Sequence, residues 1–214
     1  MEALTKDQFV IRPEQCVIAF GIPLTETGFR ADLARDDKDF AKQFQYWGRY
    51  HSEIASTVER LEPVLRGLGV QVVRDVPLNE FGQLFRKPEF RVVTLFSHWQ
   101  KADGVQEASV EFADGLKKVS SIVDEVPDSF SGVIDLCVCH PDELAAALRK
   151  RCPQGLVKDT SVQATPSFWL HFYHALFTFL RSTGATYFDA VTRVIEEFVK
   201  VARQRGYEFE KRGE

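Results

Sequence analysis

Two short apolar runs of the chain each end in a side chain that can take part in catalysis. The run that begins at Arg91 leads to His98, and the run that begins at Gly132 leads to Cys139. Continuous apolar runs of this length are typical of strands buried in a parallel sheet. Ligands of open α/β sheets bind outside the carboxyl ends of the strands, where an imidazole and a thiol can meet over one crevice. We therefore predict that Cys139 is a nucleophile and that His98 is its base.

The second run holds two cysteines, and its geometry favours one of them. Side chains alternate across a strand, so Asp135, Cys137 and Cys139 share one face. Pro141 cannot continue a central strand, which places Cys139 near the tip and Cys137 roughly 6.6–7 Å deeper. A buried cysteine usually packs as a small hydrophobic residue, which is our interpretation of Cys137 and Cys16. We prefer Cys139 as the nucleophile, with Cys137 as the open alternative.

Other polar residues near these runs have both functional and structural interpretations. A buried Asp135 needs a partner, so it is either the floor of a substrate pocket or a carboxylate that accepts backbone hydrogen bonds at the sheet end. His140 adjoins Cys139 but points to the other face of an extended chain, and we interpret it as a bystander.

His171 and His174 have a spacing that can bind metal, yet no third ligand lies nearby, so we predict no metal site. We also predict no cofactor, because residues 67–69 are a glycine pair that follows a helix rather than a strand.

Length and composition limit the class of protein. The 214 residues are 44% hydrophobic and 27% charged, as expected for one globular domain over 1–214 with an N-terminal extension over 1–14. The net charge of -4 argues against direct binding to nucleic acid. No apolar run approaches the ~20 residues that span a bilayer, and the N-terminus lacks the apolar core of a secretory signal. The cysteine spacing fits neither zinc nor a strand disulfide, so we expect reduced thiols and a cytoplasmic protein without membrane contact.

The pattern of apolar residues predicts an α/β fold, a three-layer α/β/α sandwich with a mainly parallel sheet. Core strands are expected over residues 16–21, 70–76, 91–97 and 133–139. Shorter strands are expected over 109–112, as an edge strand, and over 156–162. Helices are expected over 31–68, 79–85 with Asn79 as the cap, 115–126, 142–151, 168–180 and 189–203.

These residues resemble a known family. Residues 93–99 and 132–139 are similar to the His and Cys strands of CHAT domains, the caspase-like peptidases of bacteria. Residues 168–176 and 187–191, with Gly184 between them, resemble the helix pair that follows the nucleophile in that family. The likeness covers residues 16–202. It implies a caspase-type α/β/α sandwich and cysteine endopeptidase activity, with the base at His98 and the nucleophile at Cys139.

The chain departs from the family pattern at two positions. The glycine that commonly follows the family's histidine is Trp99 here, which keeps a backbone N–H for the oxyanion but can narrow the approach of substrate. We therefore assign substrate contact to Trp99 as well as to Asp135. The small residue found two positions after the cysteine is Pro141, which has no N–H to donate.

The resemblance also implies partners and a setting. It implies a protein substrate and, because the chain lacks the helical repeats of many CHAT proteins, a separate protein that supplies recognition or activation. The setting it implies is a bacterial defence system, antiviral defence included, or a stress response. The alternative is a catalytically silent caspase-like scaffold or regulator, which Trp99 and Pro141 favour. A flavodoxin-like binding or receiver domain would need an acidic cluster or a phosphate loop at the strand ends, and neither is evident.

Overall fold

The computed structural model describes residues 9–35, 40–100, 108–159 and 164–204. A five-stranded sheet has the order β2-β1-β3-β7-β8, and all neighbouring strands run parallel. Its strands are β1 (Cys16–Phe20), β2 (Gln71–Val73), β3 (Val92–Phe96), β7 (Val133–Cys137) and β8 (Leu156–Lys158). The prediction of one parallel sheet is confirmed, although several strands are shorter than expected. Every residue of β1, β3 and β7 is buried because both faces of the sheet are covered, which explains their continuous apolar runs.

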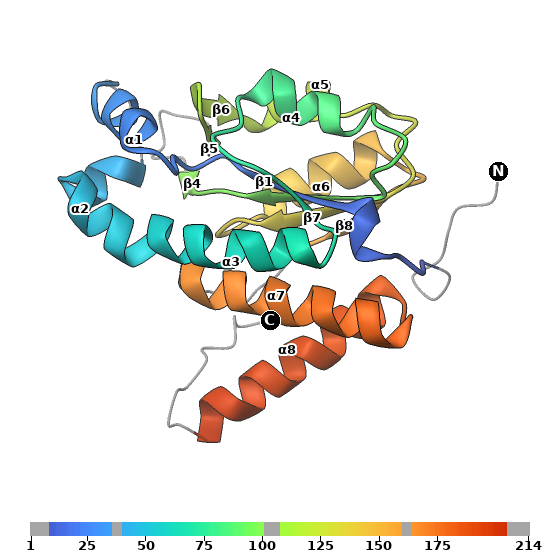
Figure 1. Ribbon diagram of the computed structural model, residues 1–214. Helices are drawn as coiled ribbons and strands as arrows, with labels where there is room; N and C mark the ends of the chain where they lie inside the picture. Colours follow the sequence, from blue (N-terminus) through green and yellow to red (C-terminus); the bar gives the residue numbers. More distant parts are fainter. Residues whose placement is uncertain (1–8, 36–39, 101–107, 160–163, 205–214) are drawn as a thin grey trace.

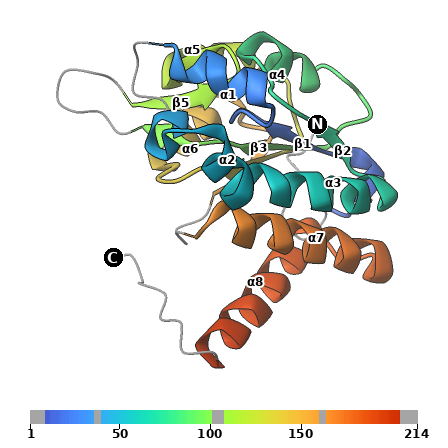
Figure 2. The same ribbon diagram turned by 60° about the vertical axis from the view of Figure 1, so that its left-hand side comes forward.

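Helices cover both faces of the sheet, as Figures 1 and 2 show. One face packs against α3 (Ser56–Gly67) and α7 (Pro166–Thr183), and the other packs against α4 (Leu78–Leu84), α5 (Val119–Glu125) and α6 (Asp142–Arg151). Each face has its own hydrophobic cluster. The three predicted layers are therefore present. Beyond them, α8 (Tyr187–Gln204) packs along the side of α7 that faces away from the sheet.

The prediction of one continuous helix over residues 31–68 is wrong. The described part of the segment contains the end of α1 (Glu26–Leu33), η3 (Phe40–Phe44), α2 (Trp47–Tyr50), η4 (His51–Ala55) and α3, while residues 36–39 lie outside the description. Gln45 has a φ of 65° and Tyr46 is extended, so no helix passes through them. Phe44 and Trp47, whose spacing indicated one helix, instead pack against Tyr50, whose ring centroid lies 5.0 Å from that of Phe44 and 5.8 Å from that of Trp47.

The region after β3 also differs from prediction. A second, antiparallel sheet has the order β4-β5-β6, formed by β4 (Trp99–Gln100), β5 (Ser109–Phe112) and β6 (Gly115–Lys118). The predicted strand over 109–112 exists, but it is the central strand of this sheet. The helix predicted over 115–126 begins only at Val119. Gly115 has a φ of 100°, which closes a tight hairpin after Phe112, so residues Gly115–Lys118 pair with β5 as strand β6.

Smaller differences concern the ends of elements. α4 begins after Pro77, and Asn79 accepts a bond from the Glu80 N–H instead of capping the helix. α6, α7 and α8 lie close to their predicted bounds, and Gly184, at a φ of 64°, ends α7. Of the strand predicted over 156–162, residues 160–162 lie outside the description. Of the predicted N-terminal extension, Phe9 and Ile11 are buried in the core. None of the described helices has the length and apolar content that crossing a membrane requires.

Candidate functional site

A small cavity lies at the edge of the sheet where the parallel strands end. Its volume is about 180 Å³, and both His98 and Cys139 line it. The two residues each follow the last residue of a strand by two positions, and those strands, β3 and β7, are neighbours with Phe96 opposite Cys137. The structure thus brings the predicted base and nucleophile to one cavity, for the topological reason that parallel strands end at one edge.

The backbone contacts show how the segments after β3 and β7 stay paired for one residue and then separate. The Ser97 N–H donates to the Cys137 carbonyl at 3.2 Å, which continues the ladder beyond the last strand residue. His140 then has a φ of 52°, in the left-handed region. The chain is therefore not extended there, and strand alternation, from which we predicted the direction of His140, does not apply to it. Pro141 follows and leads into α6.

His98 is half-buried, and the loss of water around its ring lowers the pKa of the imidazole from 6.5 to about 4. The ring is consequently neutral at pH 7, which is the form that accepts a proton. The Gln43 amide nitrogen lies 3.5 Å from His98 Nε2, at the outer limit of a hydrogen bond. Sequence reasoning missed Gln43, because an exposed glutamine in a distant segment carries no signal that links it to His98.

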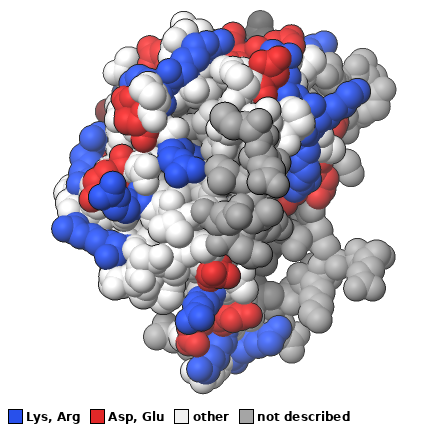
Figure 3. All heavy atoms as spheres, turned by 90° about the vertical axis from the view of Figure 1, so that its right-hand side faces the viewer, with Lys and Arg blue, Asp and Glu red and all other residues white. Residues whose placement is uncertain are grey.

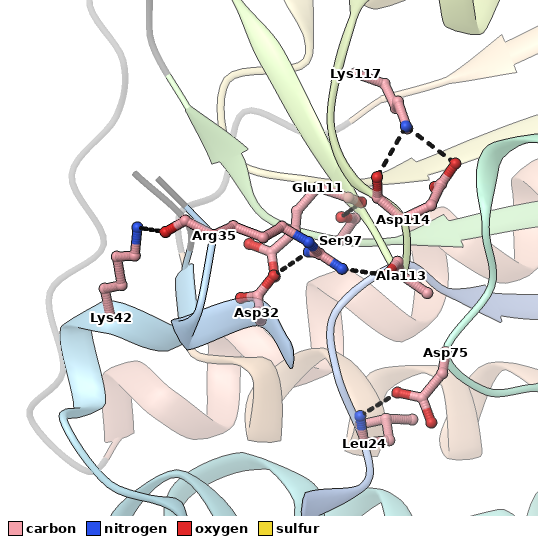
Figure 4. Close-up of polar contacts among 10 residues, drawn as sticks. All are labelled: Leu24, Asp32, Arg35, Lys42, Asp75, Ser97, Glu111, Ala113, Asp114 and Lys117. Atoms are coloured by element: carbon pink, nitrogen blue, oxygen red, sulfur yellow. Dashed lines mark hydrogen bonds and ion pairs between the residues drawn. The ribbon is translucent and has the colours of Figure 1, made fainter. Parts of the chain in front are cut away.

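A polar network lies next to the segment that carries His98, and Figure 4 shows several of its residues, among them Arg35, Ser97 and Glu111. The Glu111 N–H donates to the His98 carbonyl at 3.0 Å, and the Ser97 hydroxyl donates to the Glu111 carbonyl at 2.5 Å. The carboxyl groups of Glu111 and Asp32 point toward the Arg35 guanidinium, which binds Asp32 and the carbonyl of Ala113. β5 is therefore attached both to the segment that carries His98 and to α1.

The four cysteines lie in different surroundings. Cys139 is exposed, whereas Cys16, Cys137 and Cys152 are buried. Burial raises the pKa of the Cys16 and Cys137 thiols well above their ordinary value, and that of Cys152 to about 11. These three sulfurs stay protonated and covered at neutral pH. Their environment supports the choice of Cys139 over Cys137 as the reactive thiol.

This difference predicts the order of chemical labelling. Iodoacetamide is expected to alkylate Cys139 at least about 100-fold faster than Cys137, because only an accessible thiolate reacts. Peptide mass spectrometry over a time course measures both rates. If His98 activates the thiol, His98→Ala slows alkylation of Cys139 and leaves the buried cysteines unchanged. An unchanged Cys139 rate in that variant would mean that the histidine does not activate it.

The two residues assigned to substrate contact lie elsewhere. Asp135 is fully buried, where Lys158 Nζ lies 2.8 Å from Oδ1 and the Tyr187 hydroxyl donates to Oδ2 at 2.6 Å. Side chains, and not backbone N–H groups, thus satisfy the carboxylate. The Trp99 side chain is 7% exposed and packs with Val110 in the core on the α4–α6 side. Neither Asp135 nor Trp99 lines the cavity.

His171, one of the two histidines of α7, makes a local contact within the helix. The His171 Nδ1 lies 2.7 Å from the carbonyl of Ser167, one turn earlier. Over residues 9–35, 40–100, 108–159 and 164–204, no three side chains of His, Cys, Asp or Glu gather in a way that could hold a metal ion.

The surface on the side where the strands begin, shown in Figure 3, has positive and negative side chains intermixed rather than one charged patch.

The low pKa of His98 predicts a dependence of stability on pH. The unfolded chain binds a proton on His98 below about pH 6.5, and the folded protein does so only below about pH 4. Between these values the unfolded state holds more protons, so stability falls as the pH is lowered through this window. Urea unfolding of wild type and His98→Asn is expected to show that wild type loses about 2 kcal/mol more between pH 7 and pH 4. Parallel curves for the two proteins would contradict the assigned pKa.

The chain was also compared with known proteins. No protein-family model matches it, and no curated protein is significantly similar to it.

Proposed function

We propose that the chain is a cysteine endopeptidase of the CHAT or caspase-like type that cleaves a protein partner. The observation that carries the proposal is the cavity that His98 and Cys139 line together, at the ends of neighbouring parallel strands. A nucleophile and its base need this kind of arrangement. The exposure of Cys139 and the neutral state of His98 at pH 7 are both consistent with the roles assigned.

The reaction follows from these two side chains. His98 accepts the thiol proton as the Cys139 sulfur attacks the carbonyl carbon of the peptide bond. The carbon–nitrogen bond then breaks, and the departing amine takes the proton from His98. Water attacks the resulting thioester with His98 again as base, which releases a carboxylate and restores the thiol. Because His98 has a low pKa, proton removal is expected to accompany sulfur attack rather than precede it.

The resemblance assigns the oxyanion contact to the backbone N–H of the residue after His98. That residue is Trp99, and its side chain packs into the core away from the cavity. The indole therefore does not narrow the cavity, which supports the peptidase over the silent scaffold at this position. Pro141 still favours the scaffold, since it has no N–H to donate.

A second protein is part of the proposal. A cavity of about 180 Å³ is smaller than the roughly 300–1,000 Å³ of pockets that hold a whole small ligand, so it can position only a small part of a protein substrate. We assign recognition and activation to a partner protein. The setting in bacterial defence or stress rests on the resemblance alone. The alternative function is a caspase-like scaffold whose site does not turn over.

Labelling of new protein N-termini tests the proposal. A lysate from the source cells, under the condition that triggers the response, is incubated with wild type or with Cys139→Ala. The peptidase proposal expects new N-termini with wild type alone. If both proteins capture the same partners and neither produces new N-termini, the scaffold function replaces it.

A further inference from the structure

We infer that the cavity beside Cys139 is a pocket for one uncharged, apolar side chain, that of the residue whose carbonyl the thiol attacks. The inference rests on the proposed function and names the class of peptide that this site takes. Its basis is the chemistry of the walls, the volume they enclose and the place of the two reactive side chains among them.

The walls are mostly apolar. Six of the residues that line the cavity have no polar side-chain group apart from one indole N–H, namely Ile22, Phe96, Val138, Ala164, Pro166 and Trp169. The remaining lining residues are Ser97, His98, Cys137 and Cys139. The Ser97 hydroxyl already donates to the Glu111 carbonyl at 2.5 Å. The part of the cavity wall that the structure describes therefore offers a substrate side chain mainly apolar contact.

A charged side chain finds no counter-charge among the described residues of this wall. Among the described residues, no Lys, Arg, Asp or Glu lines the cavity. Asp135 and Lys158 are two buried charged residues of the sheet itself, and each neutralises the other in a 2.8 Å ion pair. An aspartate or arginine of a substrate would lose its water without gaining a counter-charge, and burial of an unpaired charge is strongly unfavourable.

The volume limits the occupant to a single side chain. A cavity of about 150 Å³ with apolar walls is sufficient to hold benzene. The cavity here, at about 180 Å³, therefore accepts a side chain such as that of leucine or methionine. Ile22, which follows β1, and Trp169, in the first turn of α7, are both buried wall residues, so the pocket has little freedom to widen.

The position of the pocket decides which substrate residue enters it. His98 and Cys139 belong to its wall, so the backbone that carries the bound side chain passes beside the sulfur. The carbonyl nearest to that sulfur belongs to the residue whose side chain fills the pocket. This residue then determines specificity, because one methylene more or less in an apolar pocket changes the rate by about 10–200-fold.

Peptide electrophiles test the inference without knowledge of the natural substrate. The probes are acyloxymethyl ketones on one tripeptide whose last residue is leucine, glycine, aspartate or arginine. The Cys139 sulfur displaces the carboxylate leaving group and forms a thioether, while His98 takes the thiol proton. Intact-protein mass spectrometry gives the labelling rates. The leucine probe is expected to react at least about 10-fold faster than the other three.

A cavity-filling variant supplies the structural test. Ala164→Leu is expected to slow the leucine probe at least about 10-fold and to leave the glycine probe unchanged, since only the larger side chain competes for the space. Ala146→Leu is the matched control, because Ala146 is exposed on α6 and does not line the cavity. Thermal unfolding and iodoacetamide labelling of Cys139 verify that Ala164→Leu keeps the fold and the thiol.

The outcomes separate the inference from the proposed function. Rates for the aspartate or arginine probe that equal the leucine rate, with labelling that still needs His98, would overturn the apolar pocket and leave the peptidase intact. The same conclusion follows if Ala164→Leu and Ala146→Leu behave alike. If every probe labels Cys139 at one rate in wild type and in His98→Ala, the proposed function fails and the pocket assignment fails with it.

Discussion

Cys139→Ala and His98→Ala are each expected to reduce the cleavage rate of the physiological protein substrate by at least about 10⁴-fold. Nucleophile and base act as a unit, so the double variant should lose scarcely more activity than either single variant. The cleavage rate is measured at substrate concentrations below KM, with the activating partner present. A roughly additive loss in the double variant would indicate that the two residues do not act on the same bond.

Cys152→Ala is the matched control for this experiment. It removes a buried thiol that does not line the cavity, and burial raises the pKa of that thiol to about 11. Its activity is expected to stay near that of wild type. Because Cys139 is exposed, Cys139→Ala leaves little cavity and should unfold at the same urea concentration as wild type. Retention of cleavage by Cys139→Ala would refute the assigned nucleophile.

Lys158→Met is expected to have the largest effect on stability, a loss of about 3–5 kcal/mol in the free energy of unfolding. The Lys158 side chain is 7% exposed and lies 2.8 Å from the fully buried Asp135. Its ammonium also lies 5.5 Å from the centroids of the Trp169 and Phe172 rings. Removal of this cation leaves a carboxylate without its counter-charge in a region from which water is excluded. Urea unfolding at pH 7 measures the loss.

Two further variants show whether the lost charge pair is the cause. The double variant Asp135→Asn with Lys158→Met has no buried charge, and it is expected to recover most of the lost stability. Lys200→Met removes an exposed ion pair with Glu197 and is expected to change stability by less than about 1 kcal/mol. A loss below about 1 kcal/mol in Lys158→Met itself would show that Asp135 finds another partner or a proton.

The sequence alone predicted the features that depend on local pattern. The runs that became β1, β3 and β7 are apolar without alternation, because the sheet is covered on both faces, and this pattern identified them as parallel strands. The positions of His98 and Cys139 just beyond two such strands were enough to predict that both would reach one edge of the sheet. α6, α7 and α8 were recognisable from their helical periodicity and from Gly184.

The elements that the sequence did not reveal depend on contacts between distant segments. Phe44 and Trp47 have helical spacing, yet both pack against Tyr50 although the helix is interrupted at Gln45 and Tyr46. The hairpin from Ser109 to Lys118 depends on the left-handed φ of Gly115, and its strands gain their partners only when β4 joins them. Local periodicity is overridden in both places because burial and hydrogen bonding are satisfied by tertiary packing.

For the candidate site, the sequence indicated the candidate nucleophile and base, whereas the tertiary structure determined their surroundings. Residue types and strand ends indicated His98 and Cys139, because each residue comes just after an apolar run and parallel strands end at the same edge of a sheet. Only the folded chain places Ile22 and Trp169 in the cavity wall beside them. It also gives the buried Asp135 its partner Lys158, from a different strand. Cavity walls and buried charge pairs join residues far apart in sequence, so no local pattern records them.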